Sequence, residues 1–117
     1  MVEYKYKLNL NLKNKKVFIS GSTKGIGYET ARLFLEEGAT VIINGRTKYS
    51  VDNALSKLNN KNASGIITDF LDDFQVEKLI DEIPDDIDIL INNVGIFRGK
   101  NFFDETSQDW DDHFKVN

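Results

Sequence analysis

Hydrophobic residues recur along this chain with two alternating spacings. Short apolar runs at residues 17–19, 41–43, 65–68 and 87–91 are typical of strands buried on both faces of a sheet, the third run being the weakest. The segments after these runs carry apolar residues three and four positions apart, which predicts amphipathic helices. This alternation predicts an α/β fold with a parallel, doubly wound sheet. Right-handed crossovers then give the strand order 3-2-1-4 of a Rossmann-type fold, with helix layers on both faces (α/β/α).

Capping residues predict where the helices begin and end. Gly38 is placed to end the first helix, Ser50 to cap the second and Asp72 to cap the third, which Pro84 stops. Residues 106–109 have the sequence of a capping box, which predicts the start of a last helix.

Two of these helices carry an apolar row. In the third helix the row is expected on one face, and in the last helix two aromatic residues lie one turn apart. The residues concerned are Val76, Leu79, Ile80, Ile83, Trp110 and Phe114.

The first fifteen residues follow a different pattern. Apolar and polar residues alternate from Val2 to Leu12, and a period of two predicts an amphipathic strand or arm. Such an arm either packs one apolar edge on its own domain or pairs with another chain, and the sequence leaves both possibilities open. We expect residues 1–15 to form this arm and the folded domain to begin at residue 16.

A glycine-rich turn follows the first strand and leads into the first helix. Gly21 allows a sharp turn, Gly25 lets the backbone approach a phosphate, and Gly27 lets the helix pack closely on the strand. The spacing is G-x-x-x-G-x-G and not the more common G-x-G-x-x-G. A helix N-terminus offers free amide groups and the positive end of a dipole, which suits a pyrophosphate. A purely structural turn is the alternative, but this position in the chain favours dinucleotide binding.

Charges near the turn point to one form of the cofactor. In dinucleotide-binding folds an acidic residue near the end of the second strand binds the ribose 2′-hydroxyl, whereas an arginine accommodates a 2′-phosphate. This chain has no acid there and offers Arg46, while Lys24 adds a positive charge from the turn. The pair favours NADP(H) and leaves NAD(H) possible; the alternative is that both are ordinary solvated charges.

Composition narrows the remaining classes of function. The chain has 117 residues, a net charge of −4 and no basic stripe, which argues against a nucleic-acid partner. The absence of cysteine excludes disulfides and thiolate metal sites. No run has the length of a membrane span and no signal peptide opens the chain, so we expect no membrane partner and a cytoplasmic location.

Three motifs together resemble the short-chain dehydrogenase/reductase family of the classical type. They are Ser20-Gly21-x-x-x-Gly25-Ile26-Gly27, Asn92-Asn93-Val94-Gly95 and Trp110-x-x-x-Phe114-x-Val116-Asn117, in the family's order and at its separations. The resemblance runs from Asn14 to the end. It implies an oxidoreductase that transfers a hydride between a nicotinamide cofactor and a small carbonyl or alcohol substrate. A serine at position 20 and a valine at position 94, where the family most often has threonine and alanine, are small departures.

The resemblance also implies the roles of individual residues. Asp69 matches an acidic residue that contacts the adenine, and Asn117 matches the helix asparagine that helps to organise a water-linked proton relay, so it is the candidate catalytic residue. The candidate cofactor-binding residues are Gly21, Ser22, Thr23, Lys24, Gly25, Ile26, Gly27, Arg46, Asp69, Phe70, Asn93, Val94 and Gly95.

The family's catalytic serine and Tyr-x-x-x-Lys pair have no match in these 117 residues. None of Tyr4, Tyr6, Tyr28 and Tyr49 is followed four residues later by lysine, and we expect His113 to be a surface residue and not a base. We therefore expect residues 16–117 to be the N-terminal part of a dinucleotide-binding domain whose C-terminal half is absent, and to be inactive alone. The edge of the strand at residues 87–91 then needs a cover, either more of the chain or a partner.

The family resemblance implies a homo-oligomer. Two other classes of function remain open: a relative that binds a nucleotide without turnover, and an assembly protein that uses the arm and the exposed fourth strand. Lack of the catalytic set in the complete chain would favour the first, and failure to bind a nicotinamide cofactor would favour the second.

Overall fold

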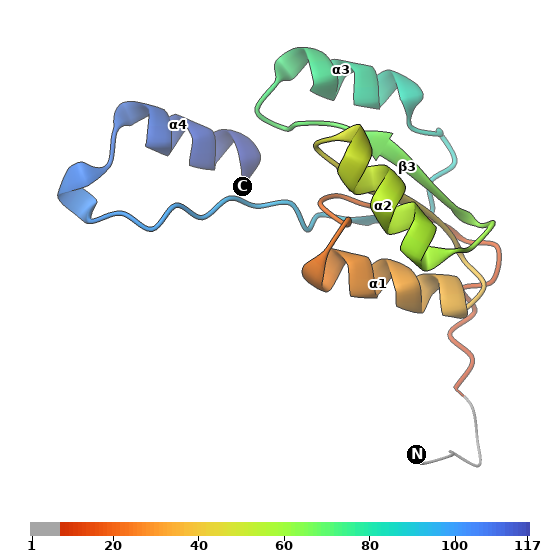
Figure 1. Ribbon diagram of the computed structural model, residues 1–117. Helices are drawn as coiled ribbons and strands as arrows, with labels where there is room; N and C mark the ends of the chain where they lie inside the picture. The colour runs from red at the N-terminus through yellow and green to blue at the C-terminus, as the bar shows by residue number, and fades with distance from the viewer. Residues whose placement is uncertain (1–7) are drawn as a thin grey trace.

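The structure is a computed structural model that describes residues 8–117. It contains a four-stranded parallel sheet in the order β3-β2-β1-β4, which confirms the predicted Rossmann-type topology (Figure 1). The strands are β1 (Lys16–Ile19), β2 (Thr40–Gly45), β3 (Ala63–Ile67) and β4 (Ile89–Ile91). The helices are α1 (Gly25–Glu36), α2 (Lys48–Leu58), α3 (Asp73–Glu82) and α4 (Ser107–Val116), with a short 3₁₀ turn, η1 (Phe102–Asp104), before α4.

Alternation along β1 builds a core on each face of the sheet. Val17 and Ile19 point to one face, where they pack with Ala31 of α1 and Ala54 of α2. Phe18 points to the other face and packs with Leu79 of α3. The sheet therefore lies between α1 and α2 on one side and α3 on the other, which gives the expected layers (Figure 1).

Helix caps agree with the sequence in three cases and differ in one. Gly38 has a φ of 85° and follows the end of α1, Asp72 accepts hydrogen bonds from the first turn of α3, and both halves of the capping box at Thr106 are present. The expected cap at Ser50 is wrong. Thr47 caps α2, because its extended backbone lets its side chain accept a hydrogen bond from the Ser50 N–H, at 3.1 Å.

All four strands differ in their limits from the predicted runs: β1 begins one residue earlier, and β2 is longer at both ends. The third begins two residues earlier than the predicted run and ends at Ile67. The fourth is shorter than the run at residues 87–91, because pairing with β1 changes at Asp88. The Asp88 N–H donates to the Lys16 carbonyl at 2.9 Å, while the Asp88 carboxylate accepts from the Lys16 N–H at 2.8 Å. The Asp88 side chain thus accepts a hydrogen bond that a backbone carbonyl would otherwise accept in the pairing of β1 with β4.

The predicted apolar row of α3 lies on one face, since Val76, Leu79, Ile80 and Ile83 all line the same groove. Of this row only Leu79 is buried, and Ile80 is 66% exposed. Residues 8–15 form no strand: Asn11 and Asn14 have φ angles of 56° and 64°, which interrupt an extended chain. The rest of the predicted arm, residues 1–7, lies outside the described residues.

The described part of the arm joins the domain at one point. The Asn14 N–H donates to the Gly38 carbonyl at 3.0 Å, so the chain enters β1 beside the turn that follows α1. Among the helices of residues 8–117, none is long and apolar enough to cross a membrane.

Candidate functional site

The glycine turn (residues 20–27) lies at the C-terminal end of the central strand β1, where it leads directly into α1. Lys24 precedes the helix in an extended conformation and makes no side-chain cap, so the first amide groups of α1 have no side-chain partner there. Gly25 has a φ of 62°, and a Cβ placed on it would meet no atom within 4 Å. Lys24, Gly25 and Ile26 are all exposed. This helix start is open and electropositive, which is the arrangement that holds a phosphate.

The side of the turn that faces the end of β4 is closely packed against both backbone and side-chain atoms. A Cβ on Gly27 would lie 2.5 Å from the Gly21 carbonyl oxygen and 2.7 Å from Asn93 Nδ2. Gly21 itself has a φ of 59°, and a Cβ on it would lie 2.9 Å from Val94 Cγ2. Two of the three glycines are thus required by close packing, while Gly25 is required by its backbone angle.

A buried polar network fixes the turn to β2 and β3. Asn44 is 1% exposed, and its side chain accepts from the Gly21 N–H at 2.9 Å and donates to the Ile66 carbonyl at 3.2 Å. Ser22 is fully buried; its hydroxyl donates to the Ile19 carbonyl at 2.7 Å and accepts from the Asn44 N–H at 2.9 Å. Sequence reasoning missed Asn44, although a polar residue that directly continues an apolar strand is the signal that could have identified it.

The ends of β1 and β4 are joined by one hydroxyl. Ser20 Oγ accepts hydrogen bonds from the N–H groups of Asn93 and Val94, at 3.0 and 3.1 Å. Asn93 returns a bond from its side chain to the Gly21 carbonyl at 2.9 Å. These bonds join the Asn-Asn-Val-Gly motif to the glycine turn, although Asn93 and Gly21 are 72 residues apart in the sequence. The two motifs therefore form one continuous surface at the end of the sheet.

The end of β2 lies beside the turn, and the two predicted charges come from these two segments, Arg46 after the strand and Lys24 in the turn. Arg46 and Lys24 are exposed, and neither makes an ion pair within residues 8–117. Thr23 packs so closely on Gly45 that a Cβ on this glycine would lie 2.5 Å from Thr23 Cγ2. The turn and the residue before Arg46 are thus in direct contact.

Asp69 and Phe70, the other two predicted residues, follow β3. The Asp69 carboxylate accepts from the Leu71 N–H at 3.0 Å, and the Asp69 N–H donates to Gln75 Oε1 at 2.9 Å. Phe70 packs against the core cluster that contains Phe18. Both residues are partly buried, and Phe70 also lines the groove between α3 and α4.

Asn117 lies just beyond the end of α4 and holds the chain that follows β4. Its side chain accepts from the Ile96 N–H at 2.7 Å and donates to the Ile96 carbonyl at 3.1 Å. Its Oδ1 is also 3.4 Å from the position of a Cβ on Gly95. The predicted helix asparagine and the glycine motif after β4 are therefore neighbours.

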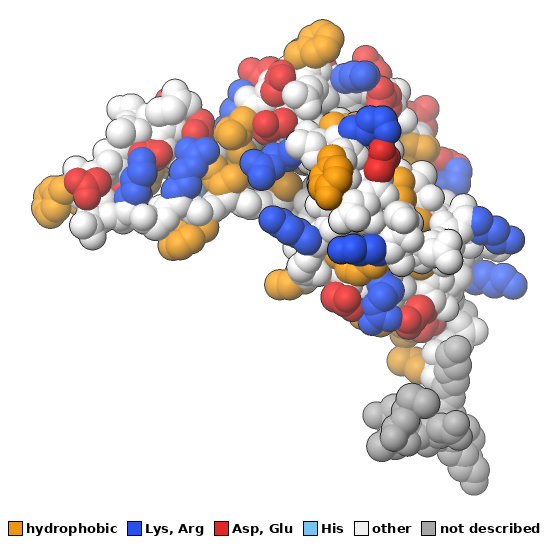
Figure 2. Space-filling view, in the orientation of Figure 1, with side chains coloured by type: hydrophobic (Ala, Val, Ile, Leu, Met, Phe, Trp, Pro, Cys, Tyr) orange, Lys and Arg blue, Asp and Glu red, His pale blue; other side chains and the backbone are white. Residues whose placement is uncertain are grey.

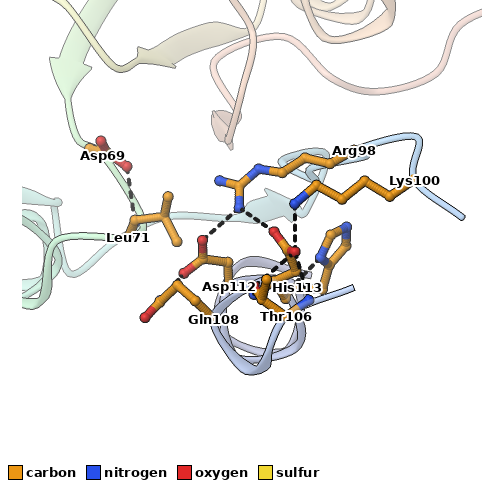
Figure 3. A network of polar contacts seen from close by, with 9 residues as sticks. Asp69, Leu71, Arg98, Lys100, Thr106, Gln108, Asp112 and His113 are labelled. Atoms are coloured by element: carbon orange, nitrogen blue, oxygen red, sulfur yellow. Dashed lines mark hydrogen bonds and ion pairs between the residues drawn. The ribbon is translucent and has the colours of Figure 1, made fainter. Parts of the chain in front are cut away.

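A charge cluster, which the sequence did not reveal, ties the same segment to α4 (Figure 3). Arg98 Nη1 lies 2.6 Å from Asp112 Oδ2, and Lys100 Nζ lies 2.6 Å from Asp109 Oδ2. The Lys100 ammonium, followed by hydrogen bonds from Thr106, lowers the pKa of Asp109 well below its usual value. Hydrogen bonding from Arg98 likewise lowers the pKa of Asp112.

His113 belongs to the same helix and was expected at the surface. It is partly buried, and its Nδ1 lies 2.6 Å from the Asp109 carbonyl oxygen. One ring nitrogen is thus occupied by the backbone of its own helix.

An apolar groove of about 620 Å³ separates α3 from α4 and opens over β4. Figure 2 shows hydrophobic side chains where α4 meets the body of the molecule. Leu90 and Phe114 line the groove and are 59% and 81% exposed, so this edge of the sheet has little cover within the described residues.

A parallel sheet of this order, with a glycine turn after its central strand, defines the dinucleotide-binding class of α/β proteins. Residues 15–117 match the short chain dehydrogenase family, and the chain belongs to that family. This family consists of oxidoreductases that use NAD or NADP.

Similar proteins support the assignment. The uncharacterized oxidoreductase YvrD of Bacillus subtilis is 41% identical over 113 residues, which are 94% of this chain and 43% of that protein. The 3-oxoacyl-[acyl-carrier-protein] reductase FabG of Aquifex aeolicus is 34% identical over 116 residues, covering 94% of this chain and 47% of that protein. A solved short chain dehydrogenase/reductase family protein aligns with a TM-score of 0.83 and 33% identity over 92% of this chain and 45% of its own. The chain spans less than half the length of these relatives.

Proposed function

We propose that this chain is the cofactor-binding part of an NADP(H)-dependent oxidoreductase that acts on a small carbonyl or alcohol substrate. The observation that carries the proposal is the open start of α1 at Gly25, next to a strand end that presents Arg46. The positive φ of Gly25 and the free space around it fit a phosphate group. When bound, the nicotinamide supplies the hydride-transfer chemistry.

In this proposal the residues of the turn bind the phosphates and the adenosine ribose, and their neighbours hold the remaining parts of the cofactor. Asp69 and Phe70 lie on the adenine side, while Asn93, Val94 and Gly95 line the cleft at the end of β4. Asn117 fixes the Ile96 backbone through two hydrogen bonds and so orients the segment that follows β4. The residues proposed for the turn are Gly21, Ser22, Thr23, Lys24, Gly25, Ile26 and Gly27.

The preference for NADP(H) rests on charge. A 2′-phosphate carries negative charge, and a cation about 4 Å away stabilises it by about 1 kcal/mol in water and about 4 kcal/mol at a typical protein surface. Arg46 and Lys24 are exposed and not engaged with acidic residues of the described chain. Both are therefore available to a 2′-phosphate.

The catalytic serine, tyrosine and lysine of the family are proposed to lie outside these 117 residues, which alone bind cofactor without turnover. A homo-oligomer is proposed as well. It is supported by Trp110 and Phe114, which stack at 6.3 Å on α4 and remain 51% and 81% exposed.

Cofactor titration of the full-length protein tests the proposal. We expect Arg46→Ala to raise the Kd for NADPH about tenfold, because it removes about 1.4 kcal/mol of charge interaction, and to leave the Kd for NADH nearly unchanged. Arg32→Ala is the matched control, since Arg32 is an exposed arginine paired with Glu29 and Glu36 on α1. An unchanged ratio of the two dissociation constants in Arg46→Ala would contradict the proposed preference.

A further inference from the structure

The chain that follows the Asn-Asn-Val-Gly motif has two unlike sides. It is neither helix nor strand, and it runs outward from the sheet without coiling (Figure 1). Its two cations, Arg98 and Lys100, each lie 2.6 Å from a carboxylate of α4 (Figure 3). Successive side chains of an extended chain point in opposite directions. We therefore expect Phe97, which is 91% exposed, to point away from α4.

The position of Gly99 supports this alternation. A Cβ placed on Gly99 would lie 3.7 Å from Cε1 and 3.9 Å from Cζ of Phe97, so the ring extends along the chain to the next residue but one. Phe97 and Gly99 thus share one side of the segment, and both are exposed. Because glycine has no side chain, it leaves room for a ligand beside the ring.

Both chain neighbours of Phe97 are held in place. The Ile96 backbone makes two hydrogen bonds with the Asn117 side chain, at 2.7 and 3.1 Å, and Arg98 is paired with Asp112. An aromatic ring on a fixed backbone loses little conformational freedom when it contacts a ligand, so less binding energy is spent on ordering it. The segment is therefore a pre-organised support for one exposed ring.

Phe97 also lies near the surface proposed to bind the cofactor. Gly95 ends the motif that lines the cleft after β4, and Asn93 of that motif donates to the Gly21 carbonyl at 2.9 Å. Two residues of extended chain span at most about 7 Å, so Phe97 begins within that distance of Gly95. A substrate that lies against a cofactor on this surface is within reach of the ring.

We propose that Phe97 binds the non-reacting part of the substrate, and that the substrate is a carbonyl compound or alcohol with an apolar, preferably aromatic, substituent. The ring offers a substrate no charge, while Arg98 and Lys100 are turned to α4 and paired there. An aromatic substituent is preferred because two rings attract each other beyond the burial of apolar area. This inference rests on the proposed oxidoreductase function and names its substrate class, with Phe97 as a specificity-determining residue.

Steady-state kinetics of the full-length protein with NADPH test the inference, with acetophenone and butanone as the two probe ketones. We expect the unmodified protein to have a kcat/KM for acetophenone at least about tenfold higher than for butanone. Phe97→Ala should lower the value for acetophenone about tenfold, chiefly by raising KM, and change that for butanone less than about twofold. Phe97→Leu should give an intermediate value for acetophenone, because it restores apolar contact without a ring.

Phe103→Ala is the matched control. Phe103 is 95% exposed in η1, where its ring contacts the Phe102 ring edge-on at 5.6 Å. Its kcat/KM for both ketones should stay within about twofold of the unmodified protein. Phe97→Ala should also keep its Tm within about 2 °C, since it removes an exposed ring.

The outcomes that overturn the inference differ from those that overturn the proposed function. If Phe97→Ala lowers kcat/KM for both ketones equally, or lowers Tm by more than about 5 °C, the ring serves packing and not substrate choice. The substrate class is likewise wrong if the protein binds NADPH but does not prefer acetophenone to butanone or reduces neither ketone. If the unmodified protein binds neither NADPH nor NADH, the proposed function fails, and the inference fails with it.

Discussion

The glycine turn (residues 20–27) and the outer segment (residues 96–117) both lie near the C-terminal end of the sheet, but different forces hold them. In the turn, buried hydroxyl and amide groups such as Ser22 and Asn44 bond to backbone atoms, and glycines allow contacts that any Cβ would block. In the outer segment, ion pairs join the chain to α4, while Phe97 and Phe103 are 91% and 95% exposed. Figure 1 shows α4 and the chain leading to it extending away from the sheet.

The two regions are therefore stabilised by two different kinds of interaction, buried hydrogen bonds in the turn and ion pairs in the outer segment. Buried hydrogen bonds and close packing respond to changes of shape and are insensitive to modest changes in pH or salt. The ion pairs of the outer segment, which join half-exposed Arg98 and Lys100 to largely buried carboxylates, respond to pH and, less than fully exposed pairs, to ionic strength. We therefore expect the two regions to fail under different perturbations.

The largest effect is expected for Gly27→Ala in the turn. Alanine ordinarily stabilises a helix relative to glycine by about 1 kcal/mol, but here its Cβ would lie 2.5 Å from the Gly21 carbonyl oxygen. We expect a loss of about 1–3 kcal/mol in the free energy of unfolding, measured by urea denaturation of the full-length protein. Gly99→Ala, in the outer segment, should change this energy by less than about 0.5 kcal/mol. Equal effects of the two variants would show that the turn is not packed as described.

A pH-dependent effect is expected for Asp109→Asn in the outer segment. The pKa of Asp109 is lowered from its usual 3.8, so its charge stabilises the fold above about pH 4. That contribution is lost as the pH falls through the lower pKa of the folded state. The variant should therefore expose α4 amides to faster hydrogen exchange at pH 7, and the difference from the unmodified protein should shrink on acidification.

Asp111→Asn is the control for this measurement. Asp111 is exposed on the same helix and makes no ion pair within residues 8–117. Its exchange rates should match those of the unmodified protein. A pH-independent effect of Asp109→Asn would mean that packing, and not charge, holds the outer segment.

The smallest effect is expected for Thr68→Val, beside the turn network. Thr68 is 1% exposed, and its hydroxyl has no hydrogen-bond partner among the described residues. Valine has nearly the same shape and removes the buried hydroxyl, so we expect a gain of up to about 1 kcal/mol in the free energy of unfolding. Thr30→Val is the control, because the Thr30 hydroxyl donates to the Ile26 carbonyl at 2.7 Å. A loss of stability in Thr68→Val would reveal that its hydroxyl is engaged.

Sequence periodicity was sufficient for the strand order and for the position of the glycine turn, since buried strands and amphipathic helices leave clear patterns. The exposure of Ile80 could not be predicted, because periodicity gives a helix face but not how much of that face the sheet covers. The cap at Thr47 was missed because Thr47 and Ser50 both carry hydroxyl groups, and only the backbone conformation distinguishes them.

The candidate site likewise contains features that the sequence predicts and features that only the folded structure reveals. Its glycines follow one another closely in the sequence, so their spacing predicts a turn. The charge cluster joins Arg98 and Lys100 to Asp109 and Asp112 across an irregular loop, and no local spacing encodes such contacts. Asn44 was overlooked because its partners lie on β3 and in the turn, distant positions that only the folded sheet brings together.

The placement of β4 beside β1 has a consequence for the order of folding. The two strands pair across more than 70 residues of intervening chain, so this contact closes a long loop and is entropically slow to form. The first three strands and their helices join through much shorter connections. Asn93 and Val94, which contact Gly21, directly follow β4 and reach the turn only when β4 pairs with β1. We expect the binding surface to be complete only once β4 has paired with β1, so that a ligand which occupies it stabilises the finished sheet.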